Sequence, residues 1–292
     1  MKFRAHETFC IRKNWLSKGL KYVEGQPNVF TSKKENPMDV LGIGSNMVKS
    51  LRYWLVATGL TEEFNSKNRR GQYFTAFGEL VRKYDPYTEE LGTLWMLHYN
   101  LIKRADMATS WFYFFNYFNL SEFTKEDFVN SLSNYARLSG VEVPIRSVED
   151  DFNCIVNTYL PRYKSSPGKE QPENNMECPL SELGLVDVQS KSGKSYKKIA
   201  PIKKSIPILI ALAVLVDNAE GRKELPLGEI KNSEGNLGKA FNLDTITLMS
   251  VLNAVESAGY IHVVRTAGLD VVRLNTDMNC MECLEKYYEG LN

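Results

Sequence analysis

The chain has 292 residues, of which 43% are hydrophobic and 24% charged, and its formal net charge is +1. These values are typical of a globular protein of two or three domains, and they exclude a globally disordered chain and one that is basic throughout. The longest apolar run, Ile206–Val216, is shorter than the about 20 residues that cross a bilayer, and the N-terminus lacks the apolar stretch of a signal peptide. We therefore expect a cytoplasmic protein without a membrane segment.

The charges are unevenly distributed along the chain. Residues 1–34 carry eight Lys and Arg against two Glu, and six lysines without an acidic residue lie between Lys191 and Lys204. Acidic residues gather at 85–90, 142–151 and 282–289. Because contacts with phosphate are local, this distribution permits nucleic-acid binding despite the low net charge.

The first informative segment is a predicted helix over residues 41–59, followed by a hairpin over 61–74 and a helix over 75–84. Ser45 or Asn46, after two glycines, is expected to cap the first helix. A helix followed by a basic hairpin is typical of a winged helix, in which the helix enters a DNA groove and the hairpin contacts phosphate. Seven residues of this helix and hairpin, and several lysines further along the chain, are candidate DNA contacts.

The candidate DNA contacts on the first helix form one stripe, in which Asn46, Lys49 and Arg52 are three residues apart, and Ser45 adjoins it. Lys67, Arg69 and Arg70 at the hairpin tip are the candidate phosphate contacts. The alternative is a solvated helix face beside a basic loop.

A further helix is predicted to start at Asp85, with Pro86 at its first position, and to run to about residue 102. Asp85, Glu89 and Glu90 place three carboxylates at its start, which is the type of cluster that holds Mg²⁺ or Mn²⁺ beside a phosphodiester, with Asp85 and Glu89 as the ligands. The alternative is that acidic residues simply favour the first turn of a helix. Residues 149–151 have the same ambiguity.

Residues 107–165 are aromatic and are predicted to be helical. Trp111–Phe118 is expected to be a buried helix, Thr124 and Asp127 to form a capping box, and Ser147 to cap a helix over 143–160. These elements resemble a helix-turn-helix bundle that no basic wing follows. The polar segment Ser165–Asn175 has the composition of a linker.

The C-terminal part repeats the first layout. A hairpin is expected at 191–204, with Lys191, Lys194, Lys197 and Lys198 as candidate DNA contacts. Helices over 206–219, 226–233 and 244–259 then lead to a second predicted wing over 260–275, which turns at Ala267-Gly268 and carries Arg265. The third of these helices offers few cations, so this unit is open to a protein-docking role.

Together these patterns predict a mainly α (α+β) fold, a helical bundle with winged helix-turn-helix units that carry small β-hairpins. The expected domains are residues 1–105, 106–164 and 177–292, with a linker at 165–176.

Two further pairs of residues are candidate functional sites, and each also has a purely structural interpretation. His6 and Glu7 can be metal ligands or a general base with its partner, or part of a polar segment folded over the core by Phe9 and Trp15. Cys280 and Cys283 have the spacing of half a zinc site, but a helix with this spacing buries both thiols on one face, and we favour that over zinc.

Five segments make the chain similar to the bacterial family known as domain of unknown function 4007. They are HETFCIRKNWLSKGL (6–20), LGIGSNMVKSLRYWL (41–55), DPYTEELGTLWMLHYNL (85–101), CPLSELGL (178–185) and ECLEKYY (282–288). The resemblance covers nearly the whole chain in the right order. It implies association with DNA phosphorothioation, an Ssp-type nicking component that acts with other proteins of the module in anti-phage defence, and a catalytic role for Asp85 with Glu89 and Glu90.

The leading hypothesis is therefore a protein that binds double-stranded DNA in such a module, with metal-dependent nicking as its activity. A non-catalytic winged-helix adaptor or transcriptional regulator is the first alternative. A protein-interaction scaffold is the second.

Overall fold

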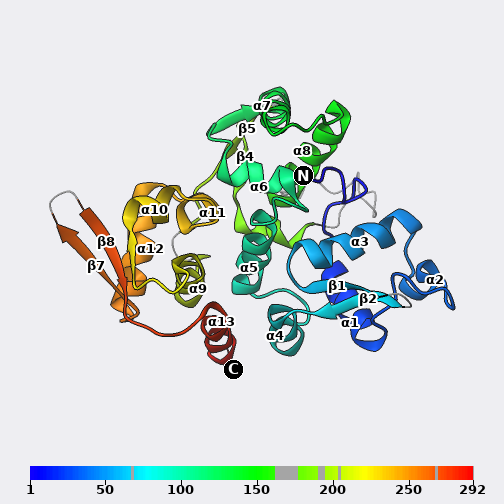
Figure 1. Cartoon of the computed structure of the whole chain (residues 1–292), viewed down its shortest axis with the longest axis horizontal. Coiled ribbons are helices and arrows are strands. Elements are labelled where there is room, and N and C mark those ends of the chain that lie inside the picture. The colour runs from blue at the N-terminus through cyan, green and yellow to red at the C-terminus, as the bar shows by residue number, and fades with distance from the viewer. Residues whose placement is uncertain (67–68, 162–176, 190–194, 203–204, 267–268, 292) are drawn as a thin grey trace, which may run out of the picture.

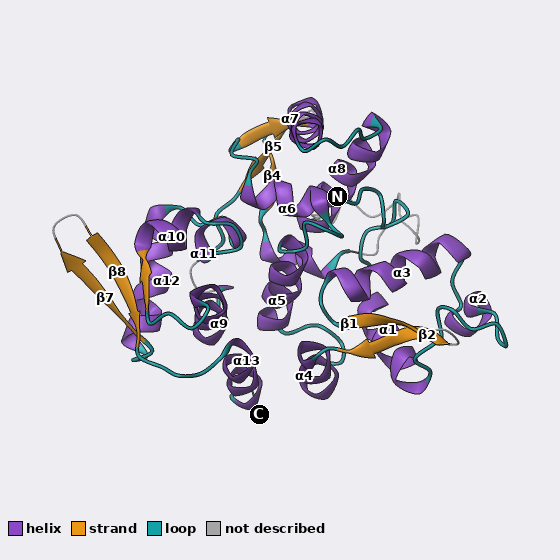
Figure 2. Ribbon diagram, viewed as in Figure 1, coloured by secondary structure: helices purple, strands orange, loops and turns teal. Residues whose placement is uncertain are grey.

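The computed structural model describes residues 1–66, 69–161, 177–189, 195–202, 205–266 and 269–291. Helices predominate, and the described strands form one two-stranded and two three-stranded antiparallel sheets (Figures 1 and 2). The mixed, mainly helical architecture with small sheets agrees with the sequence prediction. None of the helices in these ranges is long and apolar enough to cross a membrane.

In the N-terminal part, two helices pack on a third, which packs against a hairpin, and a fourth helix follows the hairpin. Its elements are α1 (Trp15–Gly25), α2 (Pro37–Leu41), α3 (Ser45–Ala57), β1 (Thr61–Ser66), β2 (Arg69–Phe74) and α4 (Ala76–Tyr84). The predicted helix, hairpin and helix are confirmed. The predicted cap of α3 is wrong, because Ser45 is already its first helical residue and Gly44 precedes it without a side-chain hydrogen bond.

Residues 85–90 form a turn instead of the predicted start of a helix. The next helix, α5, spans Leu91–Ile102. The physical reason is Asp85, whose two carboxylate oxygens accept the backbone N–H groups of Glu89 and Glu90 at 2.9 and 3.0 Å and so hold the chain in a turn. α5 is buried along most of its length, as predicted, and lies at the centre of the molecule (Figure 1).

The middle part folds around the aromatic helix. Its elements are α6 (Thr109–Asn116), β3 (Glu122–Thr124), α7 (Lys125–Leu138), α8 (Ile145–Tyr159), the 3-10 helix η1 (Pro179–Leu183), β4 (Val186–Val188) and β5 (Ser195–Lys198). The capping box of Thr124 and Asp127 is confirmed. Ser147 lies inside α8, after the cap residue Pro144, so its predicted capping role is wrong.

The hairpin β4–β5 belongs to this middle bundle. β5 pairs with β3 on one side and with β4 on the other, which gives the sheet order β3-β5-β4. A hairpin thus joins the bundle through its pairing with β3, whereas the sequence pattern had assigned residues 191–204 to the C-terminal part. β3 has only three residues, and its partner lies some 70 residues later, so neither local pattern nor spacing revealed the pairing. The predicted linker 165–176 between them lies outside the described residues.

The C-terminal part repeats the order of the middle part, a helix, a short strand, further helices and a hairpin. Its elements are α9 (Ile208–Ala219), β6 (Glu224–Pro226), α10 (Leu227–Asn232), α11 (Leu237–Ala240), α12 (Thr245–Ser257), β7 (Ile261–Thr266) and β8 (Leu269–Leu274). The sheet order β6-β8-β7 again places the last strand in the centre. The three predicted helices and the hairpin are confirmed.

The last helix, α13 (Cys280–Glu289), connects the two ends of the molecule. It packs against α9 of the C-terminal part and against α4 of the N-terminal part (Figure 1). The ring of Tyr288 stacks on that of Tyr84, with 5.6 Å between the centroids. The buried hydrophobic residues of all parts form one continuous core.

Candidate nucleic-acid interface

The outward face of α3 carries the predicted stripe only over its first turns. Ser45, Asn46 and Lys49 are exposed, and the Lys49 amine lies 3.9 Å from the Glu7 carboxylate. The rest of the helix is buried except for the partly exposed Arg52. The N-terminal segment covers it, and the carbonyl oxygen of Phe9 accepts hydrogen bonds from the side chains of Ser50 and Trp54. The part of α3 that can enter a groove is therefore its N-terminal end.

Arg52, the third residue of the predicted stripe, is bound to a carboxylate of the protein. Its guanidinium donates two hydrogen bonds to the carboxylate of Glu63 on β1, at 2.7 and 2.9 Å. Its backbone carbonyl accepts the side-chain amide of Gln72 from β2. Arg52 therefore fixes the hairpin against α3.

The hairpin β1–β2 has six register pairs and projects beside α3. Arg70 is exposed near its end and donates from Nε to the Asn65 side chain across the hairpin at 3.0 Å. Arg69 lies in β2, but its side chain and the whole of Lys67 lie outside the described residues. The structure thus places one of the three predicted hairpin contacts in full.

A loop that the sequence patterns did not single out runs along the hairpin. The Thr31 hydroxyl donates to the carbonyl oxygen of Arg70 at 2.6 Å, and the backbone N–H of Gln72 donates to the carbonyl oxygen of Pro27 at 2.8 Å. Lys33 and Lys34 follow in this loop, and both are exposed. The adjacent lysines were the available signal, but only the tertiary contacts of Pro27 and Thr31 show that the loop carrying them runs along β2.

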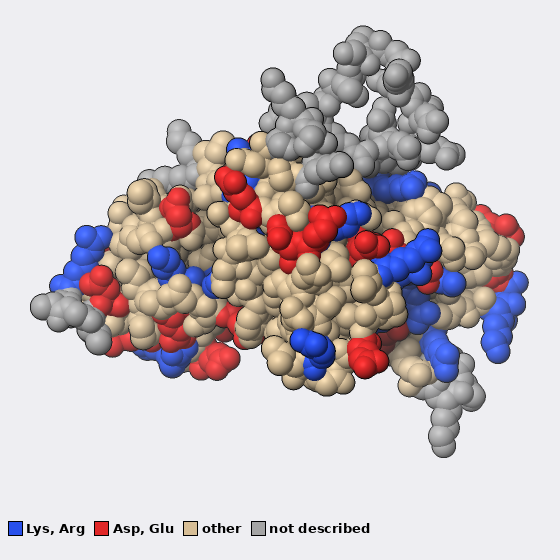
Figure 3. All heavy atoms as spheres, turned by 90° about the horizontal axis from the view of Figure 1, so that it is seen from above, with Lys and Arg blue, Asp and Glu red and all other residues tan. Residues whose placement is uncertain are grey.

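Positive charge is concentrated in the N-terminal part. Residues 1–84 contain 15 Lys and Arg against seven Asp and Glu, whereas residues 85–292 contain 21 against 28. In the view from above, Lys and Arg gather mainly over the end of the molecule formed by this part, and acidic side chains gather over its middle (Figure 3). The field of the protein therefore favours a polyanion at the N-terminal end.

The described lysines of the hairpin β4–β5 contact other groups of the protein, whereas the sequence predicted that they contact DNA. The Lys197 amine lies 3.8 Å from the Asp187 carboxylate on the neighbouring strand. Lys198 points inward, where it donates to the carbonyl oxygens of Phe114 and Phe118. Lys191 and Lys194 lie outside the described residues.

The C-terminal part has the predicted helices and hairpin, but its acidic residues outnumber its basic ones. Residues 205–291 contain seven Lys and Arg against 12 Asp and Glu. Arg265 is exposed on β7, and on α12 the most exposed hydrophobic side chain is Ile246, at 83%. This surface is better suited to a protein than to phosphate.

The predicted acidic site at residues 85–90 consists of one buried, one exposed and one half-buried carboxylate. Asp85 is 5% exposed, and each of its oxygens already accepts a backbone N–H. Glu89 is exposed, with a carboxylate oxygen 3.8 Å from the Lys13 amine, and Glu90 is half-buried. The described residues contain no group of three or more His, Cys, Asp or Glu set to hold a metal ion. In this arrangement Asp85 is committed to the backbone, and Glu89 is the most exposed of the three carboxylates.

The predicted His6 candidate is a buried hydrogen-bonding residue. Its Nε2 lies 2.8 Å from a carboxylate oxygen of Asp151, whose other oxygen accepts the Ser110 hydroxyl at 2.5 Å. The ring stacks against Trp54 and meets Trp111 edge-on. His6 is fully buried, so this network fixes the N-terminal segment over the core and cannot reach a substrate.

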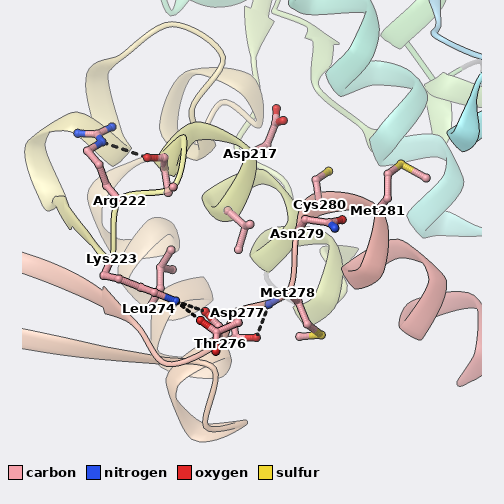
Figure 4. A pocket seen from close by; sticks show the side chains of 13 residues that line it. Asp217, Arg222, Lys223, Leu274, Thr276, Asp277, Met278, Asn279, Cys280 and Met281 are labelled. Atoms are coloured by element: carbon pink, nitrogen blue, oxygen red, sulfur yellow. Dashed lines mark hydrogen bonds and ion pairs between the residues drawn. The ribbon is translucent and has the colours of Figure 1, made fainter.

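A hollow of about 450 Å³ lies between the end of α9 and the segment that leads into α13 (Figure 4). Its charged side chains are paired with one another or with neighbours, as in the pair of Lys223 and Asp277. Cys280 lines it and Cys283 is buried behind. Burial raises the pKa of these thiols to about 12 and about 11, so both stay protonated at neutral pH.

A family model described as "Protein of unknown function (DUF4007)" matches residues 3–288. Among curated proteins, none matches the sequence. Two crystal structures of SspB, one of them described as magnesium ion-bound, are similar over 99% of this chain and 88% of theirs, with 25% identity and TM-scores of 0.86 and 0.83.

Proposed function

This chain belongs to the family described as protein of unknown function (DUF4007), and from that premise we propose that it binds double-stranded DNA in a phosphorothioation-type anti-phage defence module and nicks one strand. Phosphorothioation and nicking come from the resemblance to Ssp-type proteins. The likeness to SspB over the whole chain supports that resemblance.

One observation carries the DNA-binding part. The exposed start of α3 is followed by the hairpin β1–β2, which is the order expected of a winged helix, in the part of the chain that has the large excess of positive charge. In this arrangement Ser45, Asn46 and Lys49 face a groove, and Arg70 contacts phosphate. Lys33 and Lys34 extend the phosphate-binding side of the hairpin.

The nicking part is supported by the family resemblance and by the magnesium ion described for SspB. Mg²⁺ is commonly held by one or two carboxylates together with phosphate oxygens of the substrate. For this chain the exposed Glu89 is the accessible member of the predicted set, whereas Asp85 is committed to backbone hydrogen bonds.

Two assays on the purified chain test the two parts separately. We expect a labelled duplex to bind with an affinity that falls steeply as salt is added, and Lys49→Gln and Arg70→Gln to weaken it. Lys286→Gln, an exposed lysine on α13, is the matched control and leaves it unchanged. Binding that is indifferent to salt, or to both substitutions, would contradict the proposed surface.

Supercoiled plasmid then reports on nicking. Conversion to open circle with Mg²⁺ or Mn²⁺, and its loss in EDTA, supports a metal-dependent nickase. Duplex binding without conversion, even with the other proteins of the module added, would leave the non-catalytic adaptor or regulator as the better account.

The C-terminal part supports a second role, as a docking unit for another protein of the module. Its negative charge and the exposed Ile246 on α12 favour a protein partner. DNA and protein binding would then occupy opposite ends of the same chain.

A further inference from the structure

A second hollow, of about 360 Å³, lies where the middle part meets the C-terminal part. It is walled by the end of α6 with the loop after it, by β5, by α11 and by the start of α12, and α11 lies beside α6 (Figure 1). Its polar lining consists of Asn119, Ser121, Lys198, Lys239, Asn242 and Asp244.

Lys198 is one of the residues that line this hollow. Its amine lies 4.4 Å from the centroid of the Phe114 ring and donates to the carbonyl oxygens of Phe114 and Phe118, both at 2.5 Å. An ammonium group has three N–H donors, so one remains for a further acceptor. Because Lys198 lines the hollow, that donor can serve a ligand bound in it.

Lys239 brings a second amine to the same space. It donates to the side-chain oxygen of Asn119 at 2.6 Å, which leaves the NH₂ group of Asn119 free to donate as well. Within the described ranges, neither Lys198 nor Lys239 has a carboxylate within 4.0 Å. The one carboxylate of the lining, Asp244, accepts the backbone N–H of Thr247 and caps α12.

Two amines against the single carboxylate of the lining give this partly desolvated hollow a net positive charge. Burial lowers the pKa of Lys198 to about 7, and the neighbouring Lys239 adds to this. Such an arrangement costs free energy unless the group loses its proton or an anion enters.

We propose that this hollow is a binding site for a phosphate-class oxyanion, held by the amines of Lys198 and Lys239 and by the amide of Asn119. Its volume is in the range of small-molecule sites and suits a phosphate with an attached small group. The site lies away from α3 and β1–β2, and it does not depend on duplex binding there. A phosphate of this class comes from a free metabolite or from the end of a nucleic-acid strand.

Thermal unfolding of the whole chain tests the proposal, with sulfate, inorganic phosphate and a deoxynucleoside 5′-monophosphate compared against chloride at equal ionic strength. An anion that binds only the native state stabilises it by RT ln(1 + [L]/Kd), so the unfolding temperature rises with the logarithm of its concentration above Kd. We expect this rise with the oxyanions and none with chloride, and we expect Lys239→Gln to keep only the general stabilisation by anions excluded from the surface. A short single strand with and without a 5′-phosphate distinguishes a strand end from a free metabolite.

Sulfate keeps its charge between pH 6 and 8, so its pH dependence reports on the protein. We expect its affinity to fall across this range as the Lys198 amine loses its proton. Lys239→Gln should weaken sulfate about tenfold, the effect of losing one charged hydrogen bond. Lys231→Gln, a similarly half-buried lysine outside the hollow, should not.

Lys198→Met removes two hydrogen bonds at the end of α6 and can disturb folding, so Lys239→Gln is the deciding variant. Equal shifts with chloride and sulfate would overturn the site. Unchanged sulfate affinity in Lys239→Gln would also overturn it, and would leave Lys198 as a cap for the carbonyl groups of α6. Neither result bears on duplex binding at α3.

Discussion

At the scale of single residues, His98 links three parts of the chain through one uncharged ring. Its Nε2 lies 2.7 Å from the carbonyl oxygen of Ala240 on α11, and its Nδ1 lies 2.8 Å from the hydroxyl of Tyr159 on α8. A carbonyl oxygen only accepts, so Nε2 carries the proton and Nδ1 accepts from Tyr159. Burial lowers the pKa of His98 to about 4.

We expect this histidine to make the fold sensitive to acid. Its pKa in the unfolded chain is about 6.5, so the unfolded state takes up a proton that the native state refuses. The stabilising effect is present above about pH 6.5 and is lost as the pH falls towards 4. Urea unfolding at a series of pH values should show this decline, and His98→Gln should flatten it. An equally steep decline in the variant would assign the acid sensitivity to other groups.

Substitution of Asp85 distinguishes a structural role of this residue from a catalytic one. Asp85→Asn replaces one accepting oxygen with an NH₂ group that faces a backbone N–H, and we expect it to reduce the free energy of unfolding by about 1–3 kcal/mol. Glu89→Gln, on an exposed neighbour, should change it by less than about 0.5 kcal/mol. Chemical unfolding measures both. Wild-type stability in Asp85→Asn together with lost nicking would instead make Asp85 catalytic.

At the scale of elements, α13 explains why two distant family-like segments, 85–101 and 282–288, go together. The Tyr287 hydroxyl accepts the backbone N–H of Gly92 at 3.1 Å, and the hydroxyls of Tyr288 and Thr93 lie 2.7 Å apart. The start of α5 and the end of α13 thus form one contact. It joins the N-terminal part to the helix that packs on α9.

Gly92 permits this contact because it has no side chain. A Cβ atom there would lie 2.3 Å from the ring of Tyr287, so Gly92→Ala should push α13 away and reduce the free energy of unfolding by about 1–3 kcal/mol. The double variant with Tyr287→Ala should lose less than the sum of the two single changes, because the clash is removed. Additive losses in denaturant unfolding would show that the two residues do not meet.

The hairpin β1–β2 illustrates the different roles of two arginines on one surface. Arg70 is exposed, and Arg70→Gln should reduce the salt dependence of duplex binding by about one unit of slope. Arg52 is bound to Glu63, so Arg52→Gln should leave that slope unchanged and loosen the hairpin. Anisotropy titrations at several salt concentrations measure both slopes. A reduced slope in Arg52→Gln would place that residue on the phosphate backbone.

At the scale of the whole molecule, the three parts share a helical layout but differ in charge. Only the N-terminal part combines an exposed helix start with a basic hairpin, among the residues that the structure describes. The opposite end is acidic and carries the exposed Ile246. This difference in charge predicts that the N-terminal end of the molecule faces DNA and that the C-terminal end points away from it.

Hydrogen exchange with and without duplex DNA tests that orientation. We expect slower exchange in the loop before α2, at the start of α3 and in β1–β2, and no change in β7–β8. Protection of β7–β8 instead, centred on Arg265, would reverse the assignment of the two ends.

The sequence by itself determined the local structure of this protein. Helix and hairpin positions follow from apolar spacing and turn residues, and the capping box of Thr124 and Asp127 follows from side chains three residues apart. The five family-like segments also determined the family, because their order is a property of the chain alone. These features depend on neighbours in sequence, which is why they were predicted well.

Only the tertiary structure decided which residues share a surface. It paired β3 with β5, turned Lys198 inward, placed the loop before Lys33 and Lys34 against β2, and committed Asp85 to backbone amides. Each outcome depends on atoms far apart in the chain or on the competition between solvent and a buried partner. Residue type and spacing carry no information about that competition, so the candidate site was predicted only in outline.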